Sequence, residues 1–143
     1  MVRDIKIPRD NFNKSAYRTF IIVADVGGTN TSIAIIGVRN NTSLDIIFKN
    51  IYPTKEIQAF ELFLNDTLKK AKEEYDIEIS KAALGAAGPV SANRQYEKLT
   101  NADLDLNTSD LLNRTMLNQI ILLNEFEAVG YGLDLLDLTK VVI

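Results

Sequence analysis

A carboxylate, two glycines, a hydroxyl and an amide follow one another in the short segment DVGGTN, residues 25–30. The adjacent Gly27 and Gly28 allow a tight turn or a close approach of the backbone to another group, because neither has a Cβ atom. Successive backbone N–H groups in such a turn can form an anion-binding nest, to which the Thr29 hydroxyl adds a donor. Asp25 would repel a phosphate but can hold Mg²⁺, directly or through water. The segment is therefore a candidate seat for Mg²⁺ and a triphosphate.

The same segment also fits a plain hairpin turn, because apolar runs rich in β-branched residues lie on both sides of it. Two phosphate motifs that lead into a helix are excluded. The dinucleotide fingerprint G-x-G-x-x-G and the loop G-x-x-x-x-G-K-[ST] both need spacings that are absent here, and a strand pattern follows the glycines. A hairpin turn, with or without a ligand-binding role, is the prediction for residues 25–30.

Composition limits the other chemistry available to these 143 residues. The chain has no cysteine and no histidine, which excludes disulfides, thiolate metal sites and imidazole catalysis. Its net charge of −3 does not favour nucleic acid or an anionic membrane as a partner. No stretch approaches the roughly 18 consecutive apolar residues of a membrane span. We expect a cytoplasmic protein with no membrane and no nucleic-acid partner.

Hydrophobic periodicity predicts the elements that must position the turn. An arm or loop is expected over residues 1–18, followed by one folded lobe over residues 19–143. Within the lobe, strands are expected at 20–25, 31–38 and 43–52, then a helix over 55–75, a strand within 81–90, a short helix near 109–114, a strand at 119–123 and a helix from about Glu125. This order, β-β-β-α-β-α-β-α, predicts a mixed sheet with helices on both faces.

Three stretches carry a resemblance to one family. ADVGGTNTSIAI resembles the first phosphate motif of the glucokinases, sugar kinases of the hexokinase–actin superfamily. LGAAGPV followed by KLTNADLDL is similar to the Gly-Pro turn and Leu-Thr-Asn segment of that family, and IILLNEFEAVGYGL to its strand–helix segment with an Asn-Asp pair. The matches span residues 20–136. They favour the glucokinases over the related repressor/kinase group, which usually has Pro-Asn-Leu in the second segment.

The resemblance implies a ribonuclease-H-like, actin-like α/β lobe with a five-stranded sheet in the order 3-2-1-4-5. It implies ATP and Mg²⁺ as cofactors and a hexose, glucose, as substrate. The implied phosphate-binding residues are Asp25, Gly27, Gly28, Thr29 and Asn30, with Asp25 also at the metal.

The remaining implied roles belong to three polar residues. Asn124 and Asn101 contact sugar, and Glu125 is the catalytic base at the position where the family has aspartate. Each also has a plain structural interpretation: Asn124 as a helix N-cap, Asn101 as a turn residue, and Glu125 as a first-turn glutamate favoured by the helix dipole.

Family members are about twice as long as this chain, which corresponds to their first lobe. The expectation is an ATP-dependent glucose kinase completed by a second lobe or by self-association, with this chain alone inactive. One alternative is a shortened relative that binds without catalysis. Another is a ribonuclease-H-type nuclease, which needs several acidic residues converging on two metals; only Asp25 lies at a strand end that suits such a site.

Overall fold

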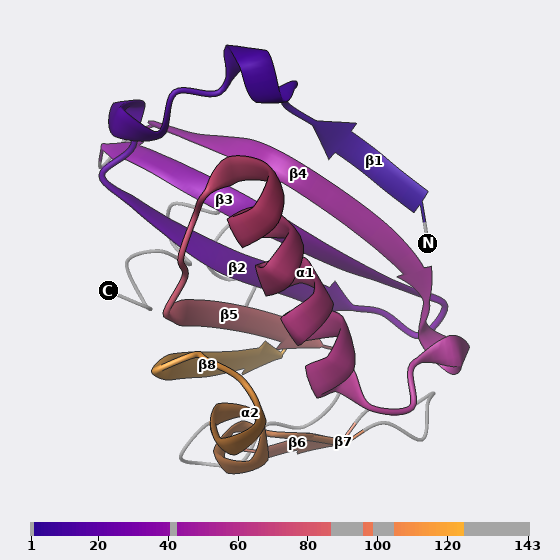
Figure 1. Ribbon diagram of the computed structural model, residues 1–143. Helices are drawn as coiled ribbons and strands as arrows, with labels where there is room; N and C mark the ends of the chain where they lie inside the picture. Colours follow the sequence, from indigo (N-terminus) through magenta and orange to yellow (C-terminus); the bar gives the residue numbers. More distant parts are fainter. Residues whose placement is uncertain (1, 41–42, 87–95, 99–104, 125–143) are drawn as a thin grey trace.

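In the computed structural model the described residues are 2–40, 43–86, 96–98 and 105–124. They form a six-stranded mixed sheet in the order β1-β4-β3-β2-β5-β8, together with a separate two-stranded sheet (Figure 1). The strands of the large sheet are β1 (Val2–Lys6), β2 (Thr19–Val26), β3 (Asn30–Asn40), β4 (Ser43–Pro53), β5 (Lys81–Ala86) and β8 (Gln119–Asn124).

The predicted strand order is confirmed. β2, β3 and β4 form an antiparallel meander, and β5 and β8 run parallel to β2 on its other side. The five predicted strands therefore lie in the order 3-2-1-4-5, which is β4-β3-β2-β5-β8. The short strands β6 (Tyr96–Lys98) and β7 (Asp105–Asn107) pair as a small antiparallel sheet that the polar sequence around them did not predict.

The N-terminal segment differs from the predicted arm or loop over residues 1–18. Its first residues form β1, which pairs antiparallel with β4 and extends the sheet to six strands (Figure 1). Two 3₁₀ turns, Arg9–Asn11 and Lys14–Ala16, then lead to β2. The strand escaped prediction because a strand at the edge of a sheet is held by main-chain hydrogen bonds and needs no apolar alternation of its own.

Aromatic contacts hold the rest of this segment against the sheet. Phe12 packs edge-on against Tyr75, with ring centroids 5.1 Å apart, and the Tyr75 hydroxyl donates a 2.6 Å hydrogen bond to the Ile7 carbonyl. The Tyr17 ring lies over Gly37, where a Cβ atom would come within 2.6 Å of a ring carbon. Residues 7–17 are therefore packed onto the same body as the meander.

Alternation along the strands divides the core into two apolar layers. Ile22, Ala24 and Val26 of β2 belong to the layer that contains the first helix, α1 (Phe60–Tyr75). Ile21 and Val23 belong to the layer on the opposite face of the sheet. The second helix, α2 (Thr108–Arg114), places Leu111 in the same layer as α1.

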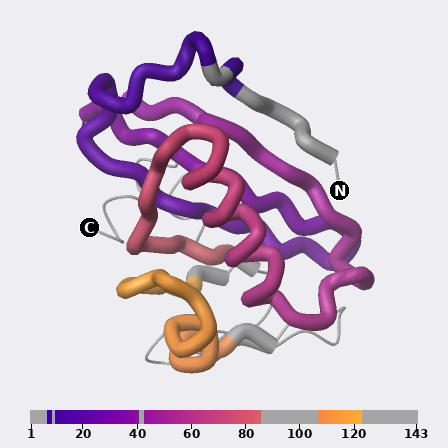
Figure 2. The backbone as a smooth tube through the Cα atoms, viewed as in Figure 1, coloured from indigo at the N-terminus to yellow at the C-terminus, as the bar shows by residue number. Residues whose placement is uncertain are grey.

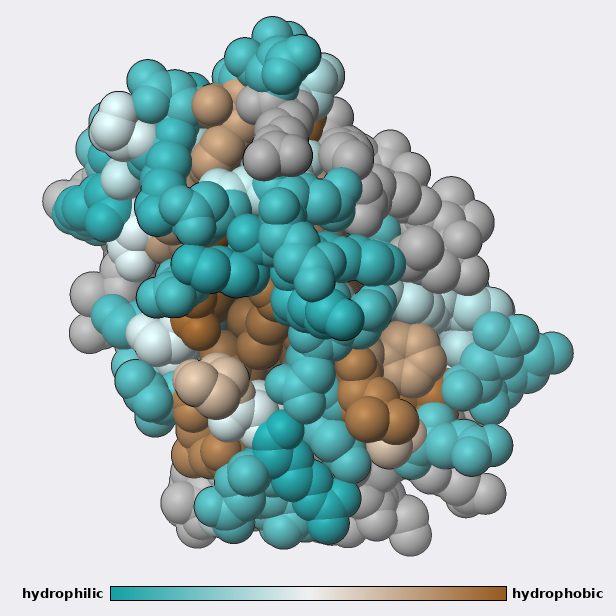
Figure 3. All heavy atoms as spheres, viewed as in Figure 1, coloured by the Kyte–Doolittle hydropathy of each residue, from teal (hydrophilic) through white to brown (hydrophobic). Residues whose placement is uncertain are grey.

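The two described helices thus share one face of the sheet, and Figure 2 shows α1 crossing the meander on that face. On the face seen in Figure 3, hydrophilic side chains surround a central group of apolar ones. The helix expected from Glu125 lies outside the described residues, so a helix on the other face stays a prediction. In the described part of the chain no helix is long and apolar enough to cross a membrane.

The helix α1 is amphipathic but shorter than the predicted 55–75. It buries Phe60, Leu64, Thr67, Ala71 and Tyr75 at three- to four-residue steps. It ends at Tyr75, and its C-cap Asp76 has a left-handed φ of 56°. Residues Thr54–Glu56 form a 3₁₀ turn, and the helix begins only at Phe60. The helix therefore starts later than predicted, with Ala59 as its N-cap residue.

Candidate functional site

The carboxyl ends of three parallel strands meet at one edge of the sheet. Val26 of β2 pairs with Ala86 of β5, and Ala86 pairs with Asn124 of β8. Open α/β sheets bind ligands outside the carboxyl ends of their strands. The glycine turn follows β2 directly, so the topology brings the turn and the end of β8 to the same edge of the sheet.

The segment after β2 is a tight hairpin turn. The Gly27 amide donates a 2.9 Å hydrogen bond to the Asn30 carbonyl, and Gly28, Thr29 and Asn30 are exposed. A Cβ atom on Gly27 would lie 2.8 Å from the Asn30 carbonyl oxygen, closer than such atoms approach in proteins. Glycine at position 27 is therefore required by the closure of the turn.

Thr54, the residue that follows β4, holds this turn through hydrogen bonds to its carbonyl groups. Its amide donates a 2.9 Å hydrogen bond to the Thr29 carbonyl, and its hydroxyl donates a 2.8 Å hydrogen bond to the Gly27 carbonyl. The hydroxyls of Thr54 and Thr31 are 2.8 Å apart. Since the Thr54 proton is given to Gly27, the Thr31 hydroxyl donates to Thr54. Both threonines are fully buried, with exposed fractions of 1% and 0%.

Sequence reasoning missed Thr54, because Pro53-Thr54 looks like the start of a helix. The sequence points to Thr54 only indirectly, through the expected pairing of the strands. Once β2, β3 and β4 are placed as a meander, the end of β4 must come beside the start of β3, and Asn30 does pair with Pro53. A polar residue just after Pro53 is thereby placed next to the glycine turn.

Asp25 lies at the exposed end of β2, on the face of the sheet opposite α1. The position follows from alternation with Ile21 and Val23, which both belong to the opposite layer. In register, Asp25 lies between Ser32 of β3 and Gly85 of β5. The neighbours of the carboxylate within the sheet are thus a small hydroxyl side chain and a residue with none.

These residues suit Mg²⁺ bound together with a phosphate. The donor set is one carboxylate with hard oxygen atoms, and Mg²⁺ usually binds through one or two carboxylates, substrate phosphates and water. Among the described residues, no three His, Cys, Asp or Glu side chains come together as a metal-binding group. The part of the chain that is described therefore does not supply the carboxylate cluster that a two-metal nuclease needs.

The other predicted site residues are described only in part. Asn124 is the last residue of β8, where its backbone pairs with Ala86. Glu125 and Asn101 lie outside the described residues. Their roles as base and sugar contact stay predictions.

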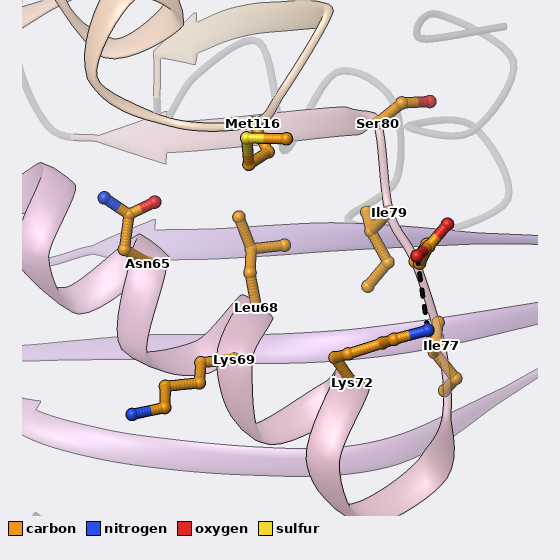
Figure 4. A pocket seen from close by; sticks show the side chains of 9 residues that line it. Asn65, Leu68, Lys69, Lys72, Ile77, Ile79, Ser80 and Met116 are labelled. Atoms are coloured by element: carbon orange, nitrogen blue, oxygen red, sulfur yellow. Dashed lines mark ion pairs between the residues drawn. The ribbon is translucent and has the colours of Figure 1, made fainter.

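A cavity of about 640 Å³ lies away from the turn, beside the segment that leads into the amino end of β5 (Figure 4). Leu68, Ile77, Ile79 and Met116 form its apolar lining, and Lys72 spans its rim to Glu78 at 3.2 Å. Lys72 also donates to Asp76 over 3.0 Å, and this hydrogen bond is the main cause that lowers the pKa of the Asp76 carboxyl. Lys69, the other lysine at this cavity, lies 3.8 Å from the Glu73 carboxylate, so both lysines are paired and the cavity offers no unpaired positive charge to an anionic ligand.

Comparison with known proteins identifies relatives over most of the chain. The sequence model of the family "Glucokinase" matches residues 22–143. The glucokinase of Trichormus variabilis is 33% identical over 115 residues, which are 80% of this chain and 32% of that protein. The glucokinase of a Nostoc species is 32% identical over 115 residues, with the same shares covered. The chain thus spans about a third of the length of these relatives.

Solved structures show the same fold. Leishmania braziliensis glucokinase matches with a TM-score of 0.67 at 21% identity, over 92% of this chain and 38% of that one. A glucokinase of Balamuthia mandrillaris, solved in complex with glucose, matches with a TM-score of 0.64 at 19% identity, over 85% and 34%. At these identities the likeness establishes the fold of the lobe.

Proposed function

The chain belongs to the glucokinase family, and we propose that it forms one lobe of an ATP-dependent hexose kinase that converts glucose to glucose 6-phosphate. The observation that carries the proposal is the glycine turn, anchored by Thr54 and next to Asp25, at the carboxyl edge of the sheet. The second lobe, the sugar and ATP are parts of the proposal that rest on the family.

In this proposal the turn binds the phosphates of ATP through its backbone amides and the Thr29 hydroxyl, with Gly27, Gly28 and Asn30 giving the backbone its close approach. Asp25 holds Mg²⁺, which when bound neutralises the negative charge of the phosphates. Transfer to a sugar then depends on positioning and electrostatics more than on covalent chemistry by the protein.

Glu125 accepts the proton of the 6-hydroxyl group of the hexose, and Asn124 orients the sugar, with Asn101 as a further sugar contact. Support for these roles comes from the position of β8, whose end adjoins the end of β5 at the edge where the glycine turn lies. Glutamate keeps the carboxylate and a reference pKa close to that of aspartate. Its additional methylene group moves the oxygens by on the order of 1 Å, a displacement that can change a rate by about 10²-fold.

The test uses this chain together with a second lobe, taken from its own reading frame or from the Trichormus variabilis relative. We expect glucose-dependent release of ADP from Mg-ATP, abolished by Glu125→Gln and retained or raised by Glu125→Asp. Glu127→Gln, two residues further along, is the matched control and should leave the rate close to wild type. Robust transfer by Glu125→Gln would overturn the assignment of the base.

The alternative function is binding without catalysis, by a relative that keeps the fold. It is favoured by the glutamate at position 125, where the family pattern has aspartate. In that case the two-lobed protein binds glucose or Mg-ATP, and neither Glu125 variant changes an activity. For the chain alone, half a cleft should bind either ligand at best with millimolar affinity, about −4 kcal/mol, and calorimetry measures this directly.

A further inference from the structure

The glycine turn presents its carbonyl groups to one residue. The Gly27 carbonyl accepts from the Thr54 hydroxyl, and the Thr29 carbonyl accepts from the Thr54 amide. Twenty-seven positions in the sequence separate Gly27 from Thr54, so this is a tertiary contact and not part of the local turn.

The direction of these two carbonyls sets the direction of two amides. In a planar trans peptide the C=O of one residue and the N–H of the next point in opposite directions, and the described residues contain no cis peptide. With the Gly27 and Thr29 carbonyls turned toward Thr54, the N–H groups of Gly28 and Asn30 point away from it. Both residues are exposed. The Asn30 carbonyl accepts from the Gly27 amide, so the Asn30 amide faces Gly27 across the hairpin. The Gly28 amide, at the exposed tip, is thereby left for an anion, as one of the amides that a nest uses.

We propose that Thr54 is a positioning residue for phosphate binding, which sets the direction of the Gly28 amide toward the phosphates of ATP. The inference rests on the proposed function, because it needs the turn to bind phosphate. Thr54 does not itself contact the nucleotide. It acts through the Gly27 and Thr29 carbonyls, and Thr31 completes the chain of hydrogen bonds by donating to the Thr54 hydroxyl.

Substituting Thr54 by valine separates this role from packing. Valine has nearly the shape of threonine, so the buried space stays filled, while the Gly27 carbonyl loses its donor and the buried Thr31 hydroxyl loses its acceptor. A buried polar group without its partner weakens the arrangement that depends on it. Thr54→Ser keeps the hydroxyl and is the conservative variant that should rescue the function.

The matched control is Thr67→Val. Thr67 is also fully buried, and its hydroxyl donates a 2.9 Å bond to the Phe63 carbonyl within α1. Its removal likewise deletes one buried hydroxyl, but that hydroxyl bonds within its own helix and not to the turn. A general loss of stability would therefore affect both valine variants, whereas loss of phosphate binding is expected for Thr54→Val alone.

The experiment is a titration of the ¹⁵N-labelled chain with Mg-ATP, following the amide signals of residues 27–30. For weak binding, the initial slope of the shift against ligand concentration scales inversely with Kd. We expect Thr54→Val to lower that slope about tenfold, with Thr54→Ser and Thr67→Val within about twofold of wild type. In the two-lobed protein the same change should raise KM for ATP and leave KM for glucose unchanged.

The outcomes separate the two proposals. If the wild-type turn shows no shift with Mg-ATP up to tens of millimolar, phosphate binding by the turn is wrong, and the role of Thr54 in it is wrong too. If the wild type binds and Thr54→Val binds equally well, only the role of Thr54 is overturned. If Thr67→Val loses binding as fully as Thr54→Val, the effect reflects general stability, and the positioning role is again overturned.

Discussion

Asp25 of β2 pairs in register with Gly85 of β5, so the position beside the Asp25 carboxylate on that face of the sheet carries no side chain. Side chains of register partners in adjacent strands project from the same face, and the strands lie about 4.8 Å apart. Val23 and Ala83 are register partners two residues earlier, and both belong to the apolar layer opposite α1. Asp25 and Gly85 therefore lie on that same face of the sheet. In the proposed function, a hydrated metal beside Asp25 would use the space that glycine at position 85 leaves.

We expect Gly85→Val to occupy this space and to weaken Mg-ATP binding about tenfold, which is roughly 1.4 kcal/mol. The thermal midpoint, measured alongside, separates a loss of binding from a loss of stability. Mn²⁺ with ATP is a convenient probe, because it broadens the amide signals of nearby residues, here residues 24–30. Gly85→Ala, which adds one methyl group, should give a smaller loss. Undiminished broadening in Gly85→Val would show that the metal does not bind beside Asp25.

Gly27→Ala should destabilise the lobe. The new methyl group would lie 2.8 Å from the Asn30 carbonyl oxygen, so the turn must open or shift. Steric insertions of this kind reduce the free energy of unfolding by about 1–3 kcal/mol. Urea unfolding measures the loss. Thr29→Ala is the control in the same turn: its exposed side chain predicts a change within about 0.5 kcal/mol, and a comparable loss in both variants would contradict the steric explanation.

The contacts of Tyr17 predict that the protein loses stability at high pH. Its hydroxyl donates over 2.8 Å to Asp45 Oδ2, which also accepts from Arg39 Nε over 2.8 Å. Burial, and then the hydrogen bond to the Asp45 carboxylate, raise the pKa of Tyr17 above the ordinary 10.0. The folded state therefore holds this proton more tightly than the unfolded state. The stabilisation is fully present below pH 10 and is lost as the pH rises through the folded-state pKa.

A titration of ¹³C-labelled tyrosine checks this expectation. Asp45→Asn removes the carboxylate and should lower the pKa of Tyr17 toward 10.0. The remaining tyrosines serve as the internal reference. A Tyr17 pKa that does not change in Asp45→Asn would mean that this contact does not hold in solution.

Tyr75→Phe tests whether the N-terminal segment belongs to the packed body. The variant keeps the ring against Phe12 and removes the hydroxyl that donates to the Ile7 carbonyl. We expect a loss of about 1 kcal/mol in the free energy of unfolding and faster hydrogen exchange of the Ile7 amide, which bonds to the Ile47 carbonyl. Exchange at Ile7 as fast in the wild type as in an unfolded peptide would restore the interpretation of residues 1–18 as an arm.

Local patterns in the sequence determined most of the elements. The runs around the glycine pair became β2 and β3, the three- and four-residue repeat became α1, and residues 109–114 became most of α2. They were predictable because burial of one face or one stripe imposes a period that is visible within a few residues. The order of the five strands was predictable only through the resemblance to the glucokinases, since periodicity carries no information about which strands are neighbours.

The residues of the candidate site likewise fall into those that the sequence could select and those that it could not. Asp25, Gly27 and Gly28 could be selected from residue type and spacing, because a tight turn needs glycine and Mg²⁺ needs oxygen. Thr54 could not, and neither could β1 as the partner of β4. Both depend on hydrogen bonds between segments that are distant in sequence, and such bonds form only once the meander has brought the end of β4 beside the turn. The sequence alone thus predicted the turn and the chemistry proposed for it, while the tertiary structure decided which residue holds the turn in place and which way the Gly28 amide points.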